Sequence, residues 1–267
     1  MKIEDVVATL ESFAPLPLQE SYDNAGLQIG LTVAEVSGVL LCLDVTEEVI
    51  CEAVEKGCNL IVAHHPLLFR PLRRVTDRTL PERCVRLALE KGVAIYAAHT
   101  NLDNAAGGVN AVIAERIGLE QTMMLRPNTL GGGSGLIGVL PEAEEAGVFL
   151  RRLSELFRVE CLMHNEWLRR PVKKVALCGG AGDFLLEDAV NAGADCFITG
   201  EMHYHLYMGM EQVIQIAVLG HYQSEQFTKE LMADILRKAF PYLKLVVSSI
   251  CTNPIKYLTS NCSSSWE

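Results

Sequence analysis

An internal repeat restricts the folds open to this chain: residues 39–63 align with residues 175–199 without a gap. Six aligned pairs are identical, namely Val39/Val175, Leu41/Leu177, Cys42/Cys178, Ala53/Ala189, Val54/Val190 and Gly57/Gly193. Each copy has an apolar run, an amphipathic stretch that ends at glycine, and a second apolar run, a pattern typical of strand–helix–strand units. Unrelated α/β units also share this pattern, so the repeat is a hypothesis that superposition of the halves tests. The pattern predicts the α/β fold class, with two similar α/β units.

A second match joins residues 93–103 to residues 215–225. In both segments an expected strand ends in a histidine, and a carboxylate follows four residues later. These pairs are His99 with Asp103 and His221 with Glu225. Ligands of open α/β sheets bind at the carboxyl ends of the strands. Two related halves are therefore expected to bring their strand ends to one shared site.

Residues 129–135 contain three consecutive glycines and predict a linker between the two units. We expect residues 1–128 and 215–267 to form the first α/β unit, which supplies most of the functional residues. Residues 129–214 are expected to form the second unit. The chain after residue 215 then returns to the first unit and completes the site.

The apolar run that precedes His64 and His65 predicts a buried strand, which Pro66 ends because proline cannot continue a central ladder. Two imidazoles then stand at the carboxyl end of the strand, and imidazole is the commonest metal-binding side chain. The alternative is that both histidines only cap a core strand by hydrogen bonding. In the repeat, Gly200 and Glu201 occupy the equivalent positions.

The polar residues at the expected strand ends form a mixed set of nitrogen and oxygen donors. They are His64, His65, His99, Asp103, His221 and Glu225. Such a set suits zinc, iron or manganese and suits calcium or magnesium poorly. A carboxylate can bridge two ions about 3.5–4 Å apart, and such a pair can turn a bound water into hydroxide. We therefore expect two divalent metal ions per chain, with zinc, iron and manganese as the candidates.

Glu225 is the expected bridge, because it is longer than Asp103 and begins a helix, where the macrodipole favours a carboxylate. His64 and Asp103 are then assigned to one ion, and His65 and His221 to the other. For Asp103 the alternative is a helix N-cap. His99 is interpreted as a catalytic-site residue that orients a metal ligand, or else as a core histidine.

Charge and composition exclude several classes of protein. The formal net charge of -10 disfavours nucleic-acid binding. No apolar run reaches the roughly 18 residues of a membrane span, and the acidic N-terminus is not that of a signal peptide. Nine cysteines without CxxC pairs favour reduced thiols and a cytoplasmic location. A basic loop follows the two histidines and either holds phosphates or is a solvated surface; its arginines are Arg70, Arg73, Arg74 and Arg78.

Four motifs resemble those of the Nif-three-like family, whose members are often named GTP cyclohydrolase 1 type 2 homologues. They lie at residues 23–30, 63–67, 98–103 and 220–225, in the family's order and across most of the chain. The resemblance implies a Nif-three-like fold with a dinuclear metal site in the cleft between the units, and a toroidal homohexamer built from dimers. By the family's pattern the ligands are His64, His65, Asp103, His221 and Glu225.

This sequence departs from the family's pattern at two positions. Tyr22 stands where the family usually has tryptophan, and Ser134 stands where a basic residue is common. Neither position belongs to the ligand set, but Ser134 is expected to alter what the cleft holds.

These observations predict a metal-dependent hydrolase with a small phosphorylated or nucleotide substrate. One version, implied by the resemblance, is a GTP cyclohydrolase in which metal hydroxide attacks C8 of a guanine nucleotide. The alternative is a non-catalytic metal-binding or regulatory oligomer, because a two-metal site is necessary for the chemistry and not sufficient. Turnover of GTP and phosphate esters by metal-loaded protein discriminates between them.

Overall fold

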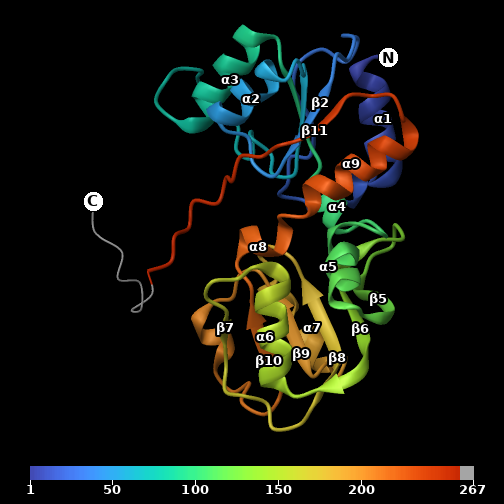
Figure 1. Ribbon diagram of the computed structural model, residues 1–267, viewed down its shortest axis with the longest axis vertical. Helices are drawn as coiled ribbons and strands as arrows, with labels where there is room; N and C mark the ends of the chain where they lie inside the picture. Colours follow the sequence, from blue (N-terminus) through green and yellow to red (C-terminus); the bar gives the residue numbers. More distant parts are fainter. Residues whose placement is uncertain (259–267) are drawn as a thin grey trace.

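The computed structural model describes residues 1–258 and consists of two lobes, each built on its own sheet (Figure 1). The first sheet has the strand order β1-β4-β3-β2-β11, and the second has the order β5-β6-β8-β9-β10-β7. The strands of the first sheet are β1 (Gly26–Ile29), β2 (Val39–Cys42), β3 (Leu60–Ala63), β4 (Ala94–Ala97) and β11 (Leu245–Val247). The strands of the second are β5 (Glu120–Pro127), β6 (Gly133–Glu144), β7 (Met163–His164), β8 (Val172–Cys178), β9 (Cys196–Thr199) and β10 (Gln215–Val218).

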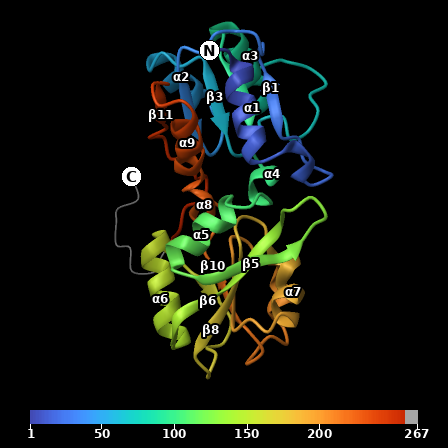
Figure 2. The same ribbon diagram turned by 90° about the vertical axis from the view of Figure 1, so that its right-hand side faces the viewer.

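Helices cover both faces of each sheet. Those packed on the first sheet are α1 (Ile3–Phe13), α2 (Glu47–Glu55), α3 (Leu80–Lys91) and α9 (Thr228–Ala239). Those packed on the second are α5 (Val109–Ile117), α6 (Ala146–Phe157) and α7 (Leu186–Asn191), with α6 and α7 on opposite faces (Figure 2). Short helical segments are α4 (Thr100–Asp103), α8 (His221–Glu225), η1 (Leu16–Leu18), η2 (Asp183–Leu185) and η3 (Tyr204–Tyr207). Among the described residues no helix has the length and apolar character of a membrane span.

Strands β2 and β3 are apolar at every position because both of their faces are covered. Val39 and Leu41 pack in the cluster that contains α1 and α9, whereas Leu40 and Cys42 pack in the cluster that contains α2 and α3. This alternation follows from the two-residue period of a strand.

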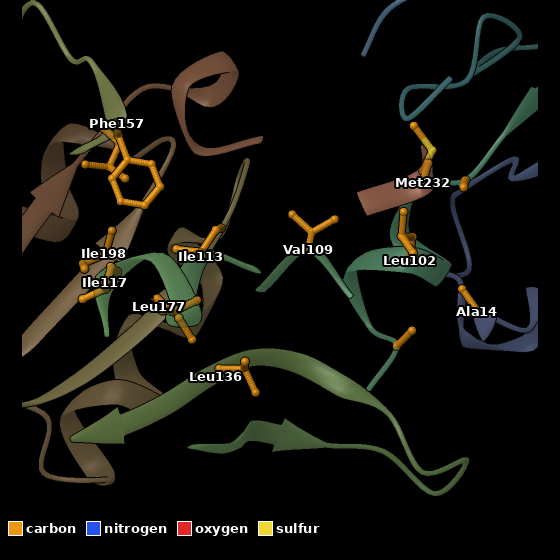
Figure 3. Close-up of a cluster of buried hydrophobic side chains, with 14 of the residues drawn as sticks. Ala14, Leu102, Val109, Ile113, Ile117, Leu136, Phe157, Leu177, Ile198 and Met232 are labelled. Carbon is orange, nitrogen blue, oxygen red and sulfur yellow. The ribbon is translucent and has the colours of Figure 1, made fainter. Parts of the chain in front are cut away.

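One hydrophobic cluster continues from the first lobe into the second, as Figure 3 shows. It runs from Ala14 and Met232 through Leu102 and Val109 to Phe157. The two lobes therefore share a core, which holds the segments between them in a defined position.

The strand pairing follows the same pattern in both copies of the repeat. Val39 pairs with Leu60 between β2 and β3, and Val175 pairs with Cys196 between β8 and β9. Both pairs of strands are parallel and both have the register that the gapless alignment predicts.

The second sequence match is displaced by one residue. The ladders pair Ala63 with Ala97 in one lobe and Thr199 with Val218 in the other. Counting on from these pairs makes Gly220, not His221, the counterpart of His99. The alignment of histidine with histidine was therefore wrong, since register is set by which side chains face the core.

The sheets also divide the chain at different positions from the expected boundaries at residues 128 and 215. Strands β5 and β10 both belong to the second sheet, where β10 pairs with β9 as the third strand of the repeat. The chain returns to the first lobe only with α9. The last residues of the range assigned to the first unit, 259–267, lie outside the described residues.

The expected linker at residues 129–135 instead comprises the turn of a hairpin between β5 and β6 and the first three residues of β6. The Asn128 amide donates to the carbonyl oxygen of Gly132 (2.8 Å), and the Gly133 amide donates to that of Asn104 (2.9 Å). A Cβ atom on Gly132 would lie 2.2 Å from the Asn104 oxygen. The glycines therefore allow the hairpin of the second lobe to pack closely against the segment that follows α4.

Candidate metal centre

The five predicted ligand residues lie close together. Three of them belong to the short helices α4 and α8, which lie where the two lobes meet (Figure 1). His64 and His65 follow β3, and Asp103 ends α4. His221 begins α8 and Glu225 ends it. This helix follows β10, the last strand of the second sheet along the chain. Segments from both sheets therefore contribute to one cluster.

The end of β3 explains why two adjacent histidines face the same site. The amides of His64 and His65 still donate to Cys42 and Leu43 (3.2 and 2.9 Å), but the regular ladder ends at Ala63. Beyond that point side chains need not alternate between faces. The two imidazole rings accordingly lie 4.9 Å apart between centroids.

His64 has a buried ring nitrogen without a hydrogen-bond partner. Its side chain is completely buried, and its Nδ1 atom lies 2.8 Å from the carbonyl oxygen of Ala98, to which it donates. Its Nε2 atom has no partner among the described residues. The nearest carboxylate oxygens belong to Asp103 (3.6 Å) and Glu225 (3.8 Å). A buried polar atom without a partner is costly, and a metal ion would satisfy this lone pair.

The two carboxylate oxygens of Glu225 face different histidines. Oε2 lies 3.1 Å from Nε2 of both His65 and His221, whereas Oε1 is directed to His64. The Nε2 atoms of His65 and His221 are 3.3 Å apart. One donor atom from each of His64, His65 and Glu225 can be chosen so that all three lie within 4.8 Å of one another. These distances suit residues that share metal ions.

Carboxylates outside the cluster orient the rings of two of these histidines. Asp44 accepts from Nδ1 of His65 (2.7 Å), and Glu201 accepts from Nδ1 of His221 (2.7 Å). This arrangement turns the other nitrogen, Nε2, toward the cluster and raises its basicity. The sequence interpretation missed Asp44, although its place two residues after the end of β2 was a usable signal.

His99 lies beside the cluster. Its Nδ1 atom bonds to Asp23 (2.7 Å) and not to one of the five clustered residues. Its ring packs against those of His64 and His65, at 5.4 and 5.5 Å between centroids. His99 therefore lies in the wall of the site, held by an aspartate of the loop before β1.

Burial and hydrogen bonding together set the protonation of the cluster. Burial lowers the pKa of His65, but hydrogen bonds to Asp44 and Glu225 raise it to about 10. Burial likewise lowers the pKa of His221, and its hydrogen bond to Glu225 raises it to about 9. Burial raises the pKa of Asp103 to about 7. Burial also raises the pKa of Glu225, yet hydrogen bonds from the histidines hold it well below its usual range. The protons on His65 and His221 offset the charge of the neighbouring carboxylates. A bound metal cation would offset the same charge in their place.

A cavity of about 450 Å³ opens beside the cluster. His65, Asp103, His221 and Glu225 line one part of it. The remaining wall consists of Glu20, Tyr22, Pro66, Phe69, His99, Thr100, Asn104, Asn110, Ser134, Cys178, Gly179, Ala181 and Phe184. The arginines of the basic loop at residues 70–78 are not part of this wall, so the sequence signal for phosphate binding does not point into the cavity.

Comparison with known proteins supports the resemblance. Residues 1–254 match the family described as Duf34/NIF3 (NGG1p interacting factor 3). A GTP cyclohydrolase 1 type 2 homolog of Clostridium acetobutylicum is 31% identical, with coverage of 96% of this chain and 99% of that protein. NIF3-like protein 1 of Drosophila melanogaster is also 31% identical, with coverage of 97% and 90%.

Solved structures show the same fold. The crystal structure of a Bacillus cereus protein related to NIF3 superposes with a TM-score of 0.89 at 24% identity, with coverage of 97% of this chain and 99% of that one. A hypothetical protein of Staphylococcus aureus superposes with the same TM-score at 25% identity and the same coverage. The match over nearly the whole chain, in sequence and in fold, means that this protein belongs to the Duf34/NIF3 family.

Proposed function

We propose that this protein binds two divalent metal ions in the cluster at the lobe junction and acts as a metal-dependent hydrolase. The observation that carries the proposal is the buried, unpartnered Nε2 atom of His64, directed toward two carboxylates. Its Nδ1 atom donates to a backbone carbonyl, so Nε2 presents a lone pair to the cluster.

The residues that would hold the ions divide into two groups. His64 and Asp103 would hold one ion, His65 and His221 would hold the other, and Glu225 would contact both. The separate directions of the two Glu225 oxygens support this division. When bound, two such ions supply a Lewis acid and a hydroxide nucleophile near neutral pH. Asp44 and Glu201 fix the orientation of the two imidazoles, and the adjoining cavity admits the substrate.

The names of several relatives, GTP cyclohydrolase 1 type 2 homolog, support hydrolysis of a ring C–N bond as the reaction class. From the family resemblance we also propose a closed homohexamer, and from the sequence argument a cytoplasmic location. A light-scattering mass equal to that of one chain would refute the hexamer.

The test begins with metal analysis of protein purified without chelators. About two ions of zinc, iron or manganese per chain are expected, and His64→Ala should lose at least one of them. Protein that remains metal-free in the presence of all three metals would contradict the proposal. Metal-loaded protein is then challenged with GTP, phosphate esters and cyclic amides. Full metal occupancy without any turnover would favour the non-catalytic metal-binding alternative.

A further inference from the structure

The segment that follows β11, residues 248–252, contacts a residue that orients one of the clustered histidines. The Oγ1 atom of Thr252 donates to Oδ2 of Asp44. The other oxygen of the same carboxylate, Oδ1, accepts from Nδ1 of His65 (2.7 Å). A hydroxyl, a carboxylate and an imidazole therefore form one chain of hydrogen bonds, which ends at an expected metal ligand.

The first residues of this segment are anchored to the first lobe. The carboxylate of Glu52 accepts from the hydroxyls of Ser248 and Ser249 and from the amide of Ser249 (3.1 Å). Nζ of Lys229 donates to the carbonyl oxygen of Ser248 (3.0 Å). Both Glu52 and Ser248 are buried. Because several hydrogen bonds fix the start of the segment, the position of Thr252, a few residues further on, is restricted as well.

The second hydrogen bond of Asp44 matters because a single bond leaves an aspartate carboxylate free to turn. The χ2 torsion of aspartate is broad and roughly twofold, so its two oxygens can exchange places. The side chain of Asp44 is 36% exposed, and packing alone therefore does not hold it. A donor on each oxygen, His65 on one and Thr252 on the other, fixes this torsion. The ring of His65 is then held with Nε2 toward Glu225.

The other two clustered histidines are held by groups outside this segment. Nδ1 of His64 donates to a backbone carbonyl oxygen (2.8 Å), and Nδ1 of His221 donates to Glu201 (2.7 Å). In the assignment proposed above, His64 belongs to one ion, whereas His65 and His221 belong to the other. A disturbance at Thr252 should therefore reach one ion position and not both.

We propose that Thr252 is a positioning residue of the metal centre, which fixes Asp44 and through it the ring of His65. It acts from outside the cavity: within residues 1–258, the cavity wall includes His65 but neither Asp44 nor Thr252. The C-terminal segment thereby supports the ion held by His65 and His221. This inference rests on the proposed function in that His65 is taken as a metal ligand.

The first test measures the affinity of both ion positions for Zn²⁺ by competition with a fluorescent chelator. Thr252→Val removes the hydroxyl with little change of shape and should weaken one of the two ions about threefold to tenfold. Thr252→Ser keeps the hydroxyl and should restore the wild-type affinity. Wild-type affinities in Thr252→Val, equal weakening of both ions, or an equally weak Thr252→Ser would each overturn the proposal.

Two further variants make this test specific. Thr76 also donates through its hydroxyl to a carboxylate of the first lobe, that of Glu82, whose hydrogen bonds run to residues near it in the sequence. Thr76→Val is therefore the matched control and should leave both affinities unchanged. Asp44→Ala should weaken the same ion as Thr252→Val, by about tenfold or more. Combining Asp44→Ala with Thr252→Val should cause no further loss, and additive losses would contradict an action through Asp44.

A measurement on metal-free protein separates this inference from the proposed function. In protein labelled with ¹⁵N-histidine, the hydrogen-bonded Nδ1 proton of His65 should give a downfield NMR signal, which His65→Gln assigns by its loss. The signal should persist in Thr252→Ser and be broadened or lost in Thr252→Val, because the proton then exchanges faster with water. A signal that is absent from the wild type, or unchanged in Thr252→Val, would refute this inference whether or not the protein binds metal. Wild-type protein that takes up no metal but shows the expected change would refute the proposed function and leave the positioning of His65 by Thr252 intact.

Discussion

Glu225 is the residue on which the two halves of the cluster depend. Its side chain is nearly fully buried and contacts histidines from the end of β3 and from its own helix. In the proposed assignment the longer side chain of Glu225 would reach both ions, whereas the shorter Asp103 would contact one. The identity of residue 225 therefore sets how the two ions would be coupled.

Substitution of Glu225 by glutamine should weaken both ions together, because it keeps the shape but removes the charge that offsets two dications. Asp103→Asn should weaken mainly one ion. The measurement is metal stoichiometry of each variant against added metal. Retention of both ions at wild-type affinity in Glu225→Gln, or loss of both only in Asp103→Asn, would show that the bridge is assigned to the wrong carboxylate.

The protonation of His65 and His221 predicts that the stability of the metal-free protein depends on pH. Their folded-state pKa values of about 10 and about 9 lie above the ordinary value of 6.5. A raised pKa contributes stability that is present below 6.5 and is lost as pH rises through the folded value. The free energy of unfolding should therefore fall between pH 7 and pH 10, by up to about 1.4 kcal/mol per proton and pH unit.

Urea denaturation in chelator at pH 7, 8 and 9 measures this loss. Asp44→Asn removes one partner of His65 and should make the fall shallower. Since bound metal replaces the same protons, the slope should also decrease when the protein is loaded with metal. A stability that rises with pH over this range would contradict the assignment of charge.

At the scale of elements, the hairpin turn between β5 and β6 packs closely against Asn104, which follows α4. Gly132→Ala should destabilise the protein by about 2 kcal/mol or more, because its Cβ atom would overlap with the Asn104 carbonyl oxygen. Gly131 has a φ of +87° and open space around it, so Gly131→Ala is a control that should cost only about 1 kcal/mol. Equal unfolding free energies for the two variants would show that the hairpin does not pack as described.

At the scale of the whole molecule, the site joins segments that belong to different lobes. His64 extends a strand of the first sheet, and His221 follows a strand of the second. Metal bound between them should therefore stabilise the packing of the two lobes as well as the site. A ligand that binds only the folded state stabilises it by about 2.7 kcal/mol at a concentration one hundred times its Kd.

Thermal unfolding with and without chelator tests this coupling. Metal removal should lower the midpoint of unfolding, and His64→Ala should be insensitive to added metal because its site is incomplete. A wild-type midpoint that does not respond to chelator, in protein shown to contain metal, would mean that the lobes do not depend on the ions.

The sequence by itself determined the features that depend on neighbouring residues. The α/β class and the strand before His64 both follow from the local apolar period. The repeat was visible because the same local pattern occurs twice. The five clustered residues were predictable because strand ends in α/β folds converge at one edge.

Only the tertiary structure decided which strands share a sheet and which groups meet the cluster. Hydrogen bonds between distant strands place β5 and β10 in the second sheet and shift the counterpart of His99 by one residue. The local sequence pattern does not encode these hydrogen bonds. Asp44 likewise reaches His65 only because β2 and β3 are adjacent. The wall of the cavity consists of residues brought together from both lobes, and no single stretch of the chain contains it.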